Sequence, residues 1–203
     1  MNEKAPRPLI FDVQTILAKY EQASKISQYL SLLEQENDKI NLVSRETSRS
    51  DLERLAAESL FPFEVIKTKS FSNYLDIGSG GGFPAIPIIL SINVKNATLI
   101  ERTKKKTLAL KRMSDQLGLK TQILDQNFKE CQFNRNFDLI TLRLVKPTNS
   151  LLNKVLKTMT DNGIIIYYSR IEEDTVKSKF TAMAYPYITN QDSPPKFFTI
   201  ITN

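Results

Sequence analysis

The glycines of this chain are concentrated in one short segment. Four of the six lie in the sequence Gly78-Ser79-Gly80-Gly81-Gly82. An apolar stretch at residues 74–77 precedes the segment and predicts a strand, and a helix is expected at about residues 84–90. A glycine-rich turn between a strand and a helix lets a ligand approach the backbone closely, because no side chain stands in the way. The segment is therefore the first candidate for a binding site.

The order of residues in this segment distinguishes three kinds of glycine loop. A P-loop requires a lysine and a serine or threonine after its glycines, whereas Phe83 and a proline follow here. A dinucleotide-binding loop requires its third glycine where Phe83 stands. The chain has Asp76-x-Gly78-x-Gly80-x-Gly82 instead. This pattern resembles the first motif of Rossmann-like S-adenosylmethionine-dependent methyltransferases.

Glu101 is the second candidate. It follows a strand predicted at residues 97–100 and lies 23 residues after Gly78. In such folds an acidic residue about 20 positions beyond the first glycine holds the ribose hydroxyls of the ligand, and a carboxylate accepts hydrogen bonds from both hydroxyls. The alternative interpretation is a tight turn without a ligand, followed by an acidic residue on the surface.

Residues that the chain lacks narrow the chemistry. It has no histidine and one cysteine, Cys131. This excludes Ser-His-Asp and Cys-His catalysis in their usual form, a zinc site of histidine or several thiolates, and an internal disulfide. We expect no metal. No apolar run of about 18 residues is present, so no membrane span is predicted, and the polar N-terminus and single cysteine fit a cytoplasmic protein.

The composition predicts a globular protein with a basic surface. Hydrophobic residues make up 41% and charged residues 25% of the 203 residues, which excludes wholesale disorder. The net charge of +6 is compatible with a polyanionic partner such as nucleic acid, and equally with no specific partner. One basic cluster is either a clamp on an RNA backbone or a solvated helix face: Arg102, Lys104, Lys105, Lys106, Lys111 and Arg112.

Before residue 70 the apolar spacing predicts helices. One helix is expected around residues 26–33, which place their apolar side chains on one face. Ser50 and Glu53 predict a capping box for a second helix, which Pro62 ends or bends.

After about residue 73 strands and helices alternate, which predicts βαβ units and a parallel sheet. Helices are expected at residues 104–117 and 149–156, the latter ending near Asn162-Gly163. A further helical segment is expected at residues 174–179. Strands are expected at residues 74–77, 97–100, 121–124, 138–142 and 164–168, and residues 183–188 and 197–201 predict an antiparallel hairpin.

The glycine segment continues into a longer signature. Residues 76–87, Asp-Ile-Gly-Ser-Gly-Gly-Gly-Phe-Pro-Ala-Ile-Pro, resemble the Gly-Phe-Pro-Gly-Ile-Pro block of the bacterial small-subunit rRNA guanine-N7 methyltransferases, the RsmG or GidB family. The resemblance extends in order over residues 16–201. Four further segments are similar to segments of that family. The family's Asn-Leu-x-x-x-Arg segment corresponds to residues 41–45, and its Glu-Arg-His-x-x-Asp-Ser-Leu helix to residues 53–60. Its Lys-Lys-x-x-Phe-Leu run corresponds to residues 105–110, and its Phe-Asp-x-x-x-Ser-Arg strand end to residues 137–143.

This resemblance implies an α/β fold. Residues 71–203 are expected to form a Rossmann-like S-adenosylmethionine-dependent methyltransferase domain, with a mostly parallel seven-stranded sheet and a C-terminal antiparallel hairpin. Residues 1–70 are expected to form an N-terminal helical extension, and the two parts are expected to form one compact unit. The implied reaction transfers a methyl group from S-adenosylmethionine to N7 of a guanine in 16S rRNA, free or within the small ribosomal subunit. We expect a cytoplasmic monomer that binds no membrane.

The glycine pattern and the resemblance together nominate the cofactor contacts. No catalytic base is expected, since guanine N7 carries an exposed lone pair, and Arg143 is the candidate for orienting the base. Phe83 and Phe128 also fit plain core packing, and Arg143 also fits a solvated strand end. Lys129 is expected to act through its backbone amide. The nominated residues are Asp76, Gly78, Gly80, Phe83, Glu101, Phe128, Lys129 and Arg143.

The chain departs from the family pattern at four places. Leu55 stands for a histidine, Leu142 for a serine, Lys129 for an acidic residue, and Tyr168-Ser169 for a lysine-glycine pair. Two other functions therefore stay open. One is a methyltransferase of the same fold that acts on another RNA or a small molecule. The other is a catalytically silent RNA-binding relative, which cofactor binding would distinguish.

Overall fold

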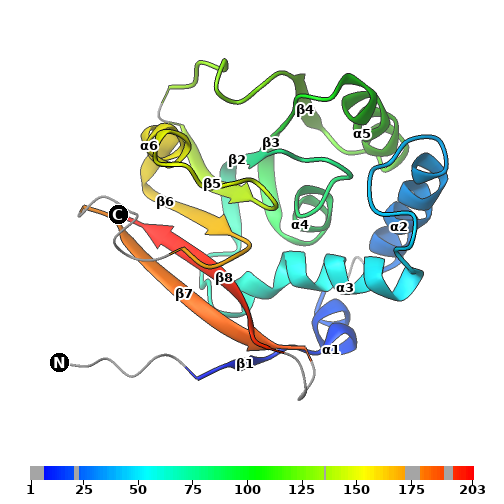
Figure 1. Ribbon diagram of the computed structural model, residues 1–203, viewed down its shortest axis with the longest axis horizontal. Coiled ribbons are helices and arrows are strands. Elements are labelled where there is room, and N and C mark those ends of the chain that lie inside the picture. Colours follow the sequence, from blue (N-terminus) through cyan, green and yellow to red (C-terminus); the bar gives the residue numbers. More distant parts are fainter. Residues whose placement is uncertain (1–6, 21–22, 135, 172–178, 190–193) are drawn as a thin grey trace.

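The computed structural model describes residues 7–20, 23–134, 136–171, 179–189 and 194–203. Its centre is a sheet with the strand order β1-β7-β8-β6-β5-β2-β3-β4 (Figure 1). The strands in the described ranges are β1 (Leu9–Ile10), β2 (Ser70–Ile77), β3 (Asn93–Glu101), β4 (Thr121–Asp125), β5 (Phe137–Leu142), β6 (Met159–Tyr167), β7 (Thr181–Ile188) and β8 (Lys196–Thr202).

The sheet is wound outward from β2 in both directions. On one side β2 pairs with β3 and β3 with β4, and on the other side β2 pairs with β5 and β5 with β6, all in parallel. β8 runs antiparallel between β6 and β7. The strand order therefore reverses between β2 and β5. Open α/β sheets bind ligands at such a reversal, outside the carboxyl ends of the strands.

The structure confirms the seven predicted strands, the mostly parallel sheet and the C-terminal antiparallel hairpin. It adds β1, which pairs in parallel with β7 at the outer edge of the sheet. The expectation of helices before residue 70 does not include this strand. Two residues are too few for a period to be recognised in the sequence.

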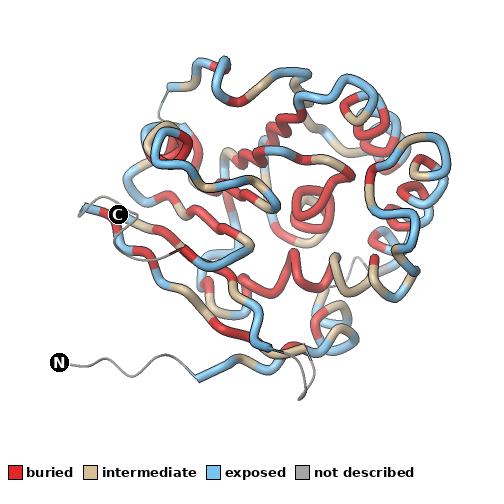
Figure 2. The backbone as a smooth tube through the Cα atoms, viewed as in Figure 1, coloured by how far each residue is buried: buried red, intermediate tan, exposed pale blue. Residues whose placement is uncertain are grey.

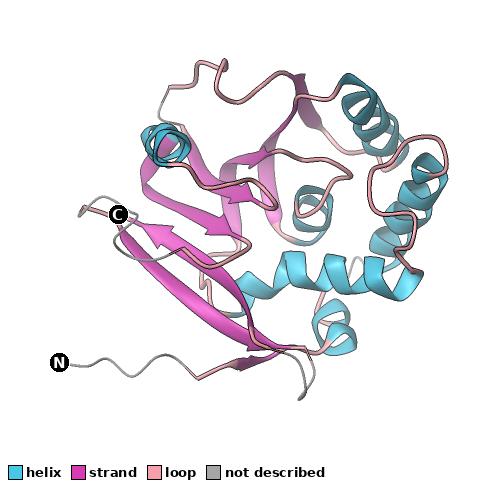
Figure 3. Cartoon of the chain, in the orientation of Figure 1, coloured by secondary structure: helices cyan, strands magenta, loops and turns pink. Residues whose placement is uncertain are grey.

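Helices cover both faces of the sheet (Figure 3). Residues of α2 (Ala23–Asn37), α3 (Arg49–Leu60), α4 (Ala85–Ser91) and α5 (Lys104–Gln116) form one core cluster with Tyr74 of β2. Residues of α6 (Asn149–Thr158) form a second cluster with the neighbouring Leu75, because successive strand residues point to opposite faces. Figure 2 shows buried segments along the central strands and α4. The helices are α1 (Val13–Ala18), α2 (Ala23–Asn37), α3 (Arg49–Leu60), the 3₁₀ helix η1 (Phe61–Glu64), α4 (Ala85–Ser91), α5 (Lys104–Gln116) and α6 (Asn149–Thr158).

The start of α3 differs from the prediction. Ser48, not Ser50, is the N-cap: its hydroxyl accepts a hydrogen bond from the backbone N–H of Asp51, whose carboxylate accepts one from the backbone N–H of Ser48. The sequence contains two overlapping capping boxes, and Glu53 of the other one lies instead 3.7 Å from Arg49. Helix α3 ends at Leu60, and the proline that follows lies in the first turn of η1.

Two further expectations concern the second half of the chain. Helix α6 ends at Thr158 and β6 begins at once at Met159, so Asn162 and Gly163 lie inside a strand and not in a turn. The strand is irregular there, since its register with β5 shifts between Phe137 and Leu139. The helix expected at residues 174–179 lies almost entirely outside the described residues.

The core does not stop at the boundary suggested by the sequence. The core cluster that includes side chains of α2 and α3 also includes side chains of β2 and β3. The division into an extension before residue 70 and a methyltransferase domain after it stays a prediction. None of the helices in the described ranges is long and apolar enough to cross a membrane.

Candidate active site

A cavity of about 670 Å³ opens at the carboxyl ends of β2, β3, β4 and β5. It lies at the reversal of strand order and has the size of a small-molecule site. The structure brings together there seven of the eight nominated residues, which come from the glycine loop after β2 and from the carboxyl ends of β3, β4 and β5. They are Gly78, Gly80, Phe83, Glu101, Phe128, Lys129 and Arg143.

The glycine loop leaves one backbone segment open toward this cavity. Gly80 has a φ of +52°, and a Cβ atom built on it would find its nearest heavy atom, the carbonyl oxygen of Gly78, 3.8 Å away. Gly82 has a φ of +105°, and a Cβ atom there would lie 2.7 Å from a methyl carbon of Ile86. Gly82 is therefore required for packing, whereas the space in front of Gly80 suits a ligand that approaches the backbone.

Helix α2 supports the loop from behind. The hydroxyl of the buried Tyr29 donates a hydrogen bond of 2.9 Å to the carbonyl of Gly81. A Cβ atom on Gly81 would lie 3.2 Å from Leu33 and 3.4 Å from Leu42. The loop is thus packed against the N-terminal helices as well as against the sheet.

Glu101 is buried at the end of β3 and lines the cavity. One carboxylate oxygen accepts a hydrogen bond from the backbone N–H of Gly80 (3.0 Å), and the other accepts one from the N–H of Thr103 (2.7 Å). The carboxylate therefore ties the glycine loop to β3. Each carboxylate oxygen can accept about two hydrogen bonds, which leaves acceptor capacity for the predicted ribose hydroxyls.

Asp76 does not line the cavity, although it belongs to the glycine motif. It is buried, and one of its oxygens accepts a hydrogen bond of 2.5 Å from the hydroxyl of Thr141 on β5, which in turn lies 2.7 Å from the hydroxyl of Tyr74. Burial raises the pKa of Asp76 to about 6, and the charge of Glu101 also raises it, while hydrogen bonds from Ser79 and Thr141 lower it. Asp76 joins β2 to β5 next to the loop.

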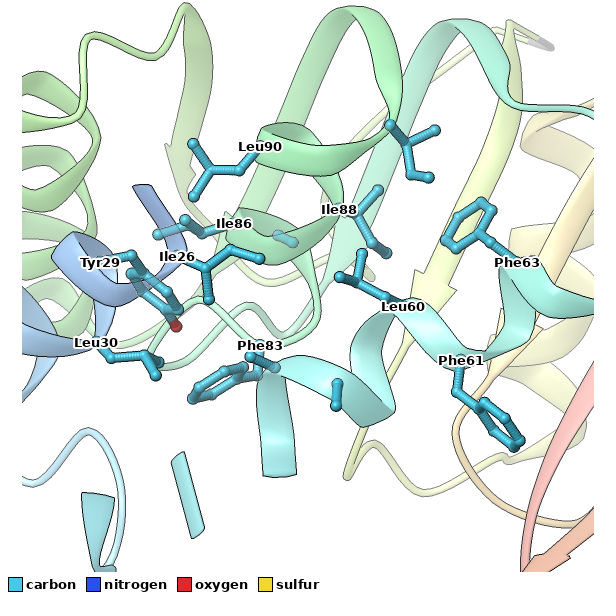
Figure 4. Close-up of a cluster of buried hydrophobic side chains, with 14 of the residues drawn as sticks. Ile26, Tyr29, Leu30, Leu60, Phe61, Phe63, Phe83, Ile86, Ile88 and Leu90 are labelled. Atoms are coloured by element: carbon cyan, nitrogen blue, oxygen red, sulfur yellow. The ribbon is translucent and has the colours of Figure 1, made fainter. Parts of the chain in front are cut away.

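Phe83 and Phe128 contribute both to the cavity wall and to the core. The ring of Phe83 packs edge-on against Tyr29 at 5.3 Å between centroids (Figure 4). The ring of Phe128 is stacked on Phe133 at 6.4 Å. The two interpretations of these residues, ligand contact and core packing, are therefore compatible.

Lys129 lines the cavity as expected, but the backbone amide expected to contact the cofactor already has a partner in the protein. Its backbone N–H donates a hydrogen bond of 3.0 Å to the side chain of Asn127, so this amide is already used within the loop after β4. Its carbonyl accepts a hydrogen bond of 2.6 Å from Lys154 of α6, whose ammonium lies 5.3 Å from the centroid of the Phe128 ring. Lys154 thus holds both Phe128 and Lys129 in place.

Arg143 is not a solvated strand end. Its side chain is 12% exposed, lies 5.5 Å from the ring centroid of Tyr168 and donates a hydrogen bond of 2.5 Å to Glu58 on α3. Glu58 is 4% exposed and also binds Arg54 at 3.0 Å and Lys196 at 2.7 Å. Burial raises the pKa of Glu58, but the charges and hydrogen bonds of Arg143 and Lys196 outweigh burial, and the pKa lies below its ordinary value.

Comparison with known proteins settles the family. A family model described as rRNA small subunit methyltransferase G matches residues 22–194. The chain belongs to this family. A protein of the same name from Mycoplasmopsis pulmonis is 36% identical over 132 residues, which make up 64% of this chain and 56% of that protein. Another from Pelagibacter ubique is 30% identical over 179 residues, 81% of this chain and 82% of that protein. The predicted family and its S-adenosylmethionine-dependent class are confirmed.

Solved structures share the fold of this family member at low sequence identity. An O-methyltransferase from Bacillus cereus in complex with SAH gives a TM-score of 0.61 at 15% identity and covers 94% of this chain and 99% of that chain. A ribosomal protein L11 methylase from Lactobacillus delbrueckii gives 0.58 at 14% identity, over 74% and 79% of the two chains. The Rossmann-like methyltransferase fold is confirmed.

Several residues of the cavity wall were not predicted from the sequence. Gln126 and Asn127 follow β4, a position that the rule of carboxyl strand ends could have singled out. Leu42 and Val43 follow α2 and line the cavity; they belong to the segment 41–45 that resembles the family, but neither was nominated as a site residue. Leu144, directly after Arg143, also lines the cavity.

The structure places members of the basic cluster in different surroundings. Arg102 and Lys106 line the cavity, together with Lys129 and Lys146 from other segments. Arg112 instead forms an ion pair with the buried Glu36 of α2 and so joins α5 to α2. The cations beside the cavity therefore come from three segments of the chain, and the basic cluster predicted from the sequence supplies only some of them.

Proposed function

We propose that the chain transfers the methyl group of S-adenosylmethionine to N7 of a guanine in 16S rRNA, either free or within the small ribosomal subunit. We further propose that it does so as a monomer in the cytoplasm. The observation that carries the proposal is the open space in front of the Gly80 backbone, beside Glu101 and at the reversal of strand order, in a chain of this family.

This reaction suits a chain without histidine. When bound, S-adenosylmethionine supplies a methyl group that its sulfonium centre already activates. Guanine N7 presents a lone pair on the major-groove edge of the base, so no side chain has to remove a proton. The chain has only to hold the two reactants in line and close together.

Each group in the cavity wall then has a positioning role. Gly80 admits the amino-acid end of the cofactor to the backbone beside Gly78, and the free lone pairs of Glu101 accept the ribose hydroxyls. Phe128 packs on the adenine. Arg143 follows β5, across the strand reversal from the glycine loop, and Glu58 holds its guanidinium in place. The guanidinium offers hydrogen-bond donors in one plane to the guanine edge or to a phosphate.

The first experiment measures binding and methyl transfer with the full chain. Calorimetry should give a micromolar Kd for S-adenosylmethionine and its demethylated product, or about −7 to −8 kcal/mol. Labelled cofactor, 16S rRNA transcribed in vitro and small ribosomal subunits should yield labelled 7-methylguanosine after digestion to nucleosides. The absence of heat and of a thermal shift at millimolar ligand would refute the proposal. Binding without transfer would favour the silent relative, and label in another nucleoside a different substrate.

A matched pair of variants tests the glycine loop. Gly80 and Gly118 both have positive φ and open space around their missing Cβ atom, but Gly118 lies after α5, away from the cavity. Alanine at either position costs about 1–2 kcal/mol of backbone strain. Gly80→Ala should in addition weaken cofactor binding by at least about tenfold, or 1.4 kcal/mol, and Gly118→Ala should bind like the wild type. Equal affinities of the two variants would show that this loop is not the site.

A further inference from the structure

Leu144 combines three properties that protein folding alone does not explain. Its side chain is 98% exposed, more than any other large hydrophobic residue in the described part of the chain. Its φ of +58° makes it the one non-glycine residue with positive φ among the described residues. It lines the cavity. A leucine is disfavoured in this backbone conformation, and its exposure in water brings no hydrophobic stabilisation.

The neighbours of Leu144 explain how it is held there. Arg143 is anchored by Glu58 on one side. On the other side, the carbonyl of Val145 accepts a hydrogen bond of 3.0 Å from the hydroxyl of Tyr167, and a Cβ atom built on Gly78 would lie 2.9 Å from Val145. Because both flanking residues are fixed, the backbone between them makes a left-handed turn and presents the leucine at the edge of the cavity.

The charges around Leu144 indicate what it meets. Lys129 and Lys146 are exposed and line the same cavity as Arg102, while Glu101 is the one carboxylate among the described lining residues. A polyanion is therefore attracted to this opening. Proteins that contact or displace nucleobases set an apolar side chain against the base and basic side chains near the phosphates.

We propose that Leu144 packs on the face of the guanine that enters the cavity and holds it for methylation, while Lys129 and Lys146 contact the adjacent phosphates. The proposal rests on the proposed function, since it deepens the same site. Leu144 is then a residue for positioning the RNA substrate, and it makes no contact that cofactor binding requires. The anchoring of Arg143 and Val145 keeps the side chain in the path of the base.

Two variants separate the apolar contact from the backbone conformation. Leu144→Gly removes both the side chain and the backbone strain. Leu144→Asn introduces a residue that tolerates positive φ but lacks the apolar surface of leucine. Ile10→Ala is the matched control, because Ile10 is 84% exposed on β1 and does not line the cavity. All variants should bind S-adenosylmethionine like the wild type, and Leu144→Gly should unfold at a higher temperature.

The decisive measurement uses 16S rRNA transcribed in vitro and, in parallel, small ribosomal subunits. Both Leu144 variants should need at least about tenfold more RNA for half-maximal methylation, the ratio expected when the burial of a leucine side chain is lost, and Ile10→Ala should need no more than the wild type. Unchanged RNA dependence of both Leu144 variants would overturn the proposal. If the wild type methylates neither RNA, the proposed function fails. The contact between Leu144 and RNA is then tested by direct binding of the same RNA, and equal affinities of the wild type and Leu144→Gly would refute this contact.

Discussion

Replacing Glu58 by glutamine removes a negative charge at the point where three cations meet. Arg54 comes from the same helix, Arg143 from the end of β5 and Lys196 from the start of β8. Glutamine has nearly the same shape as glutamate and keeps one acceptor oxygen. The substitution therefore tests the charge of Glu58 and not the packing around it.

The expected loss follows from how exposed each cation is. Arg54 and Lys196 are 32% and 43% exposed, so they can regain hydration, and each pair contributes only about 0–1 kcal/mol. Arg143 is 12% exposed and would remain as an unpaired buried charge, a situation that costs about 3–5 kcal/mol. Since glutamine still accepts one hydrogen bond, we expect the lower end, about 3 kcal/mol, which lowers Tm by about 6–12 °C in a chain of this size.

Thermal unfolding followed by circular dichroism measures this loss. Glu53→Gln on the same helix is the control, because its partner Arg49 lies 3.7 Å away and both side chains are about one-third exposed, so its effect should stay within about 0.5 kcal/mol. The lowered pKa of Glu58 means that its contribution is present above about pH 4.3 and is lost as pH falls through the folded-state pKa. Wild type and Glu58→Gln should therefore converge in acid. A Tm of Glu58→Gln within 2 °C of wild type at pH 7 would refute the reasoning, since 1 kcal/mol alone corresponds to about 2–4 °C.

Three other substitutions test the surroundings of the cavity. Arg143→Ala should lower the single-turnover rate of methyl transfer at saturating cofactor more than it weakens cofactor affinity, and an unchanged rate would contradict its role in orienting the base. Burial raises the folded-state pKa of Asp76 to about 6, so the folded state holds this proton more tightly than the unfolded state and the wild type loses stability as pH rises from about 4 to 7. Asp76→Asn has no such proton, and its stability relative to wild type should therefore increase by up to about 2–3 kcal/mol over this range. Urea midpoints of the two proteins that run parallel over the same pH range would exclude this explanation. Lys154→Met should weaken cofactor binding about three- to tenfold without a comparable loss of Tm, since it removes the ammonium that binds the Lys129 carbonyl and faces Phe128; calorimetry with an unchanged Kd would remove Lys154 from the site.

The sequence predicted those parts of the molecule that depend on local chemistry. Alternating apolar strands and helices determine a parallel sheet, and the glycines at 78, 80 and 82 are readable because their positive φ excludes most side chains. Residues at carboxyl strand ends, such as Glu101 and Arg143, could be nominated because the fold places all such ends beside one crevice.

What could not be predicted depends on distances through space. The ion pair between Glu58 and Arg143 joins residues 85 positions apart, and no periodicity indicates it. The occupied backbone amide of Lys129 follows from the way in which Asn127 folds back on it. The choice of Ser48 over Ser50 as a helix cap was ambiguous locally, because both residues have an acidic partner three positions on. The exposure of Leu144 depends on the anchoring of its two neighbours.

The hydroxyl of Tyr29 that reaches the carbonyl of Gly81 also has a consequence for the dynamics of the site. If α2 detaches, this carbonyl loses its donor and Gly81 loses the packing of Leu33. The local opening of α2 and that of the glycine loop should therefore belong to one cooperative unit. Amide hydrogens of α2 should accordingly exchange more slowly once a ligand occupies the cavity, although the helix itself is separated from the ligand by the loop.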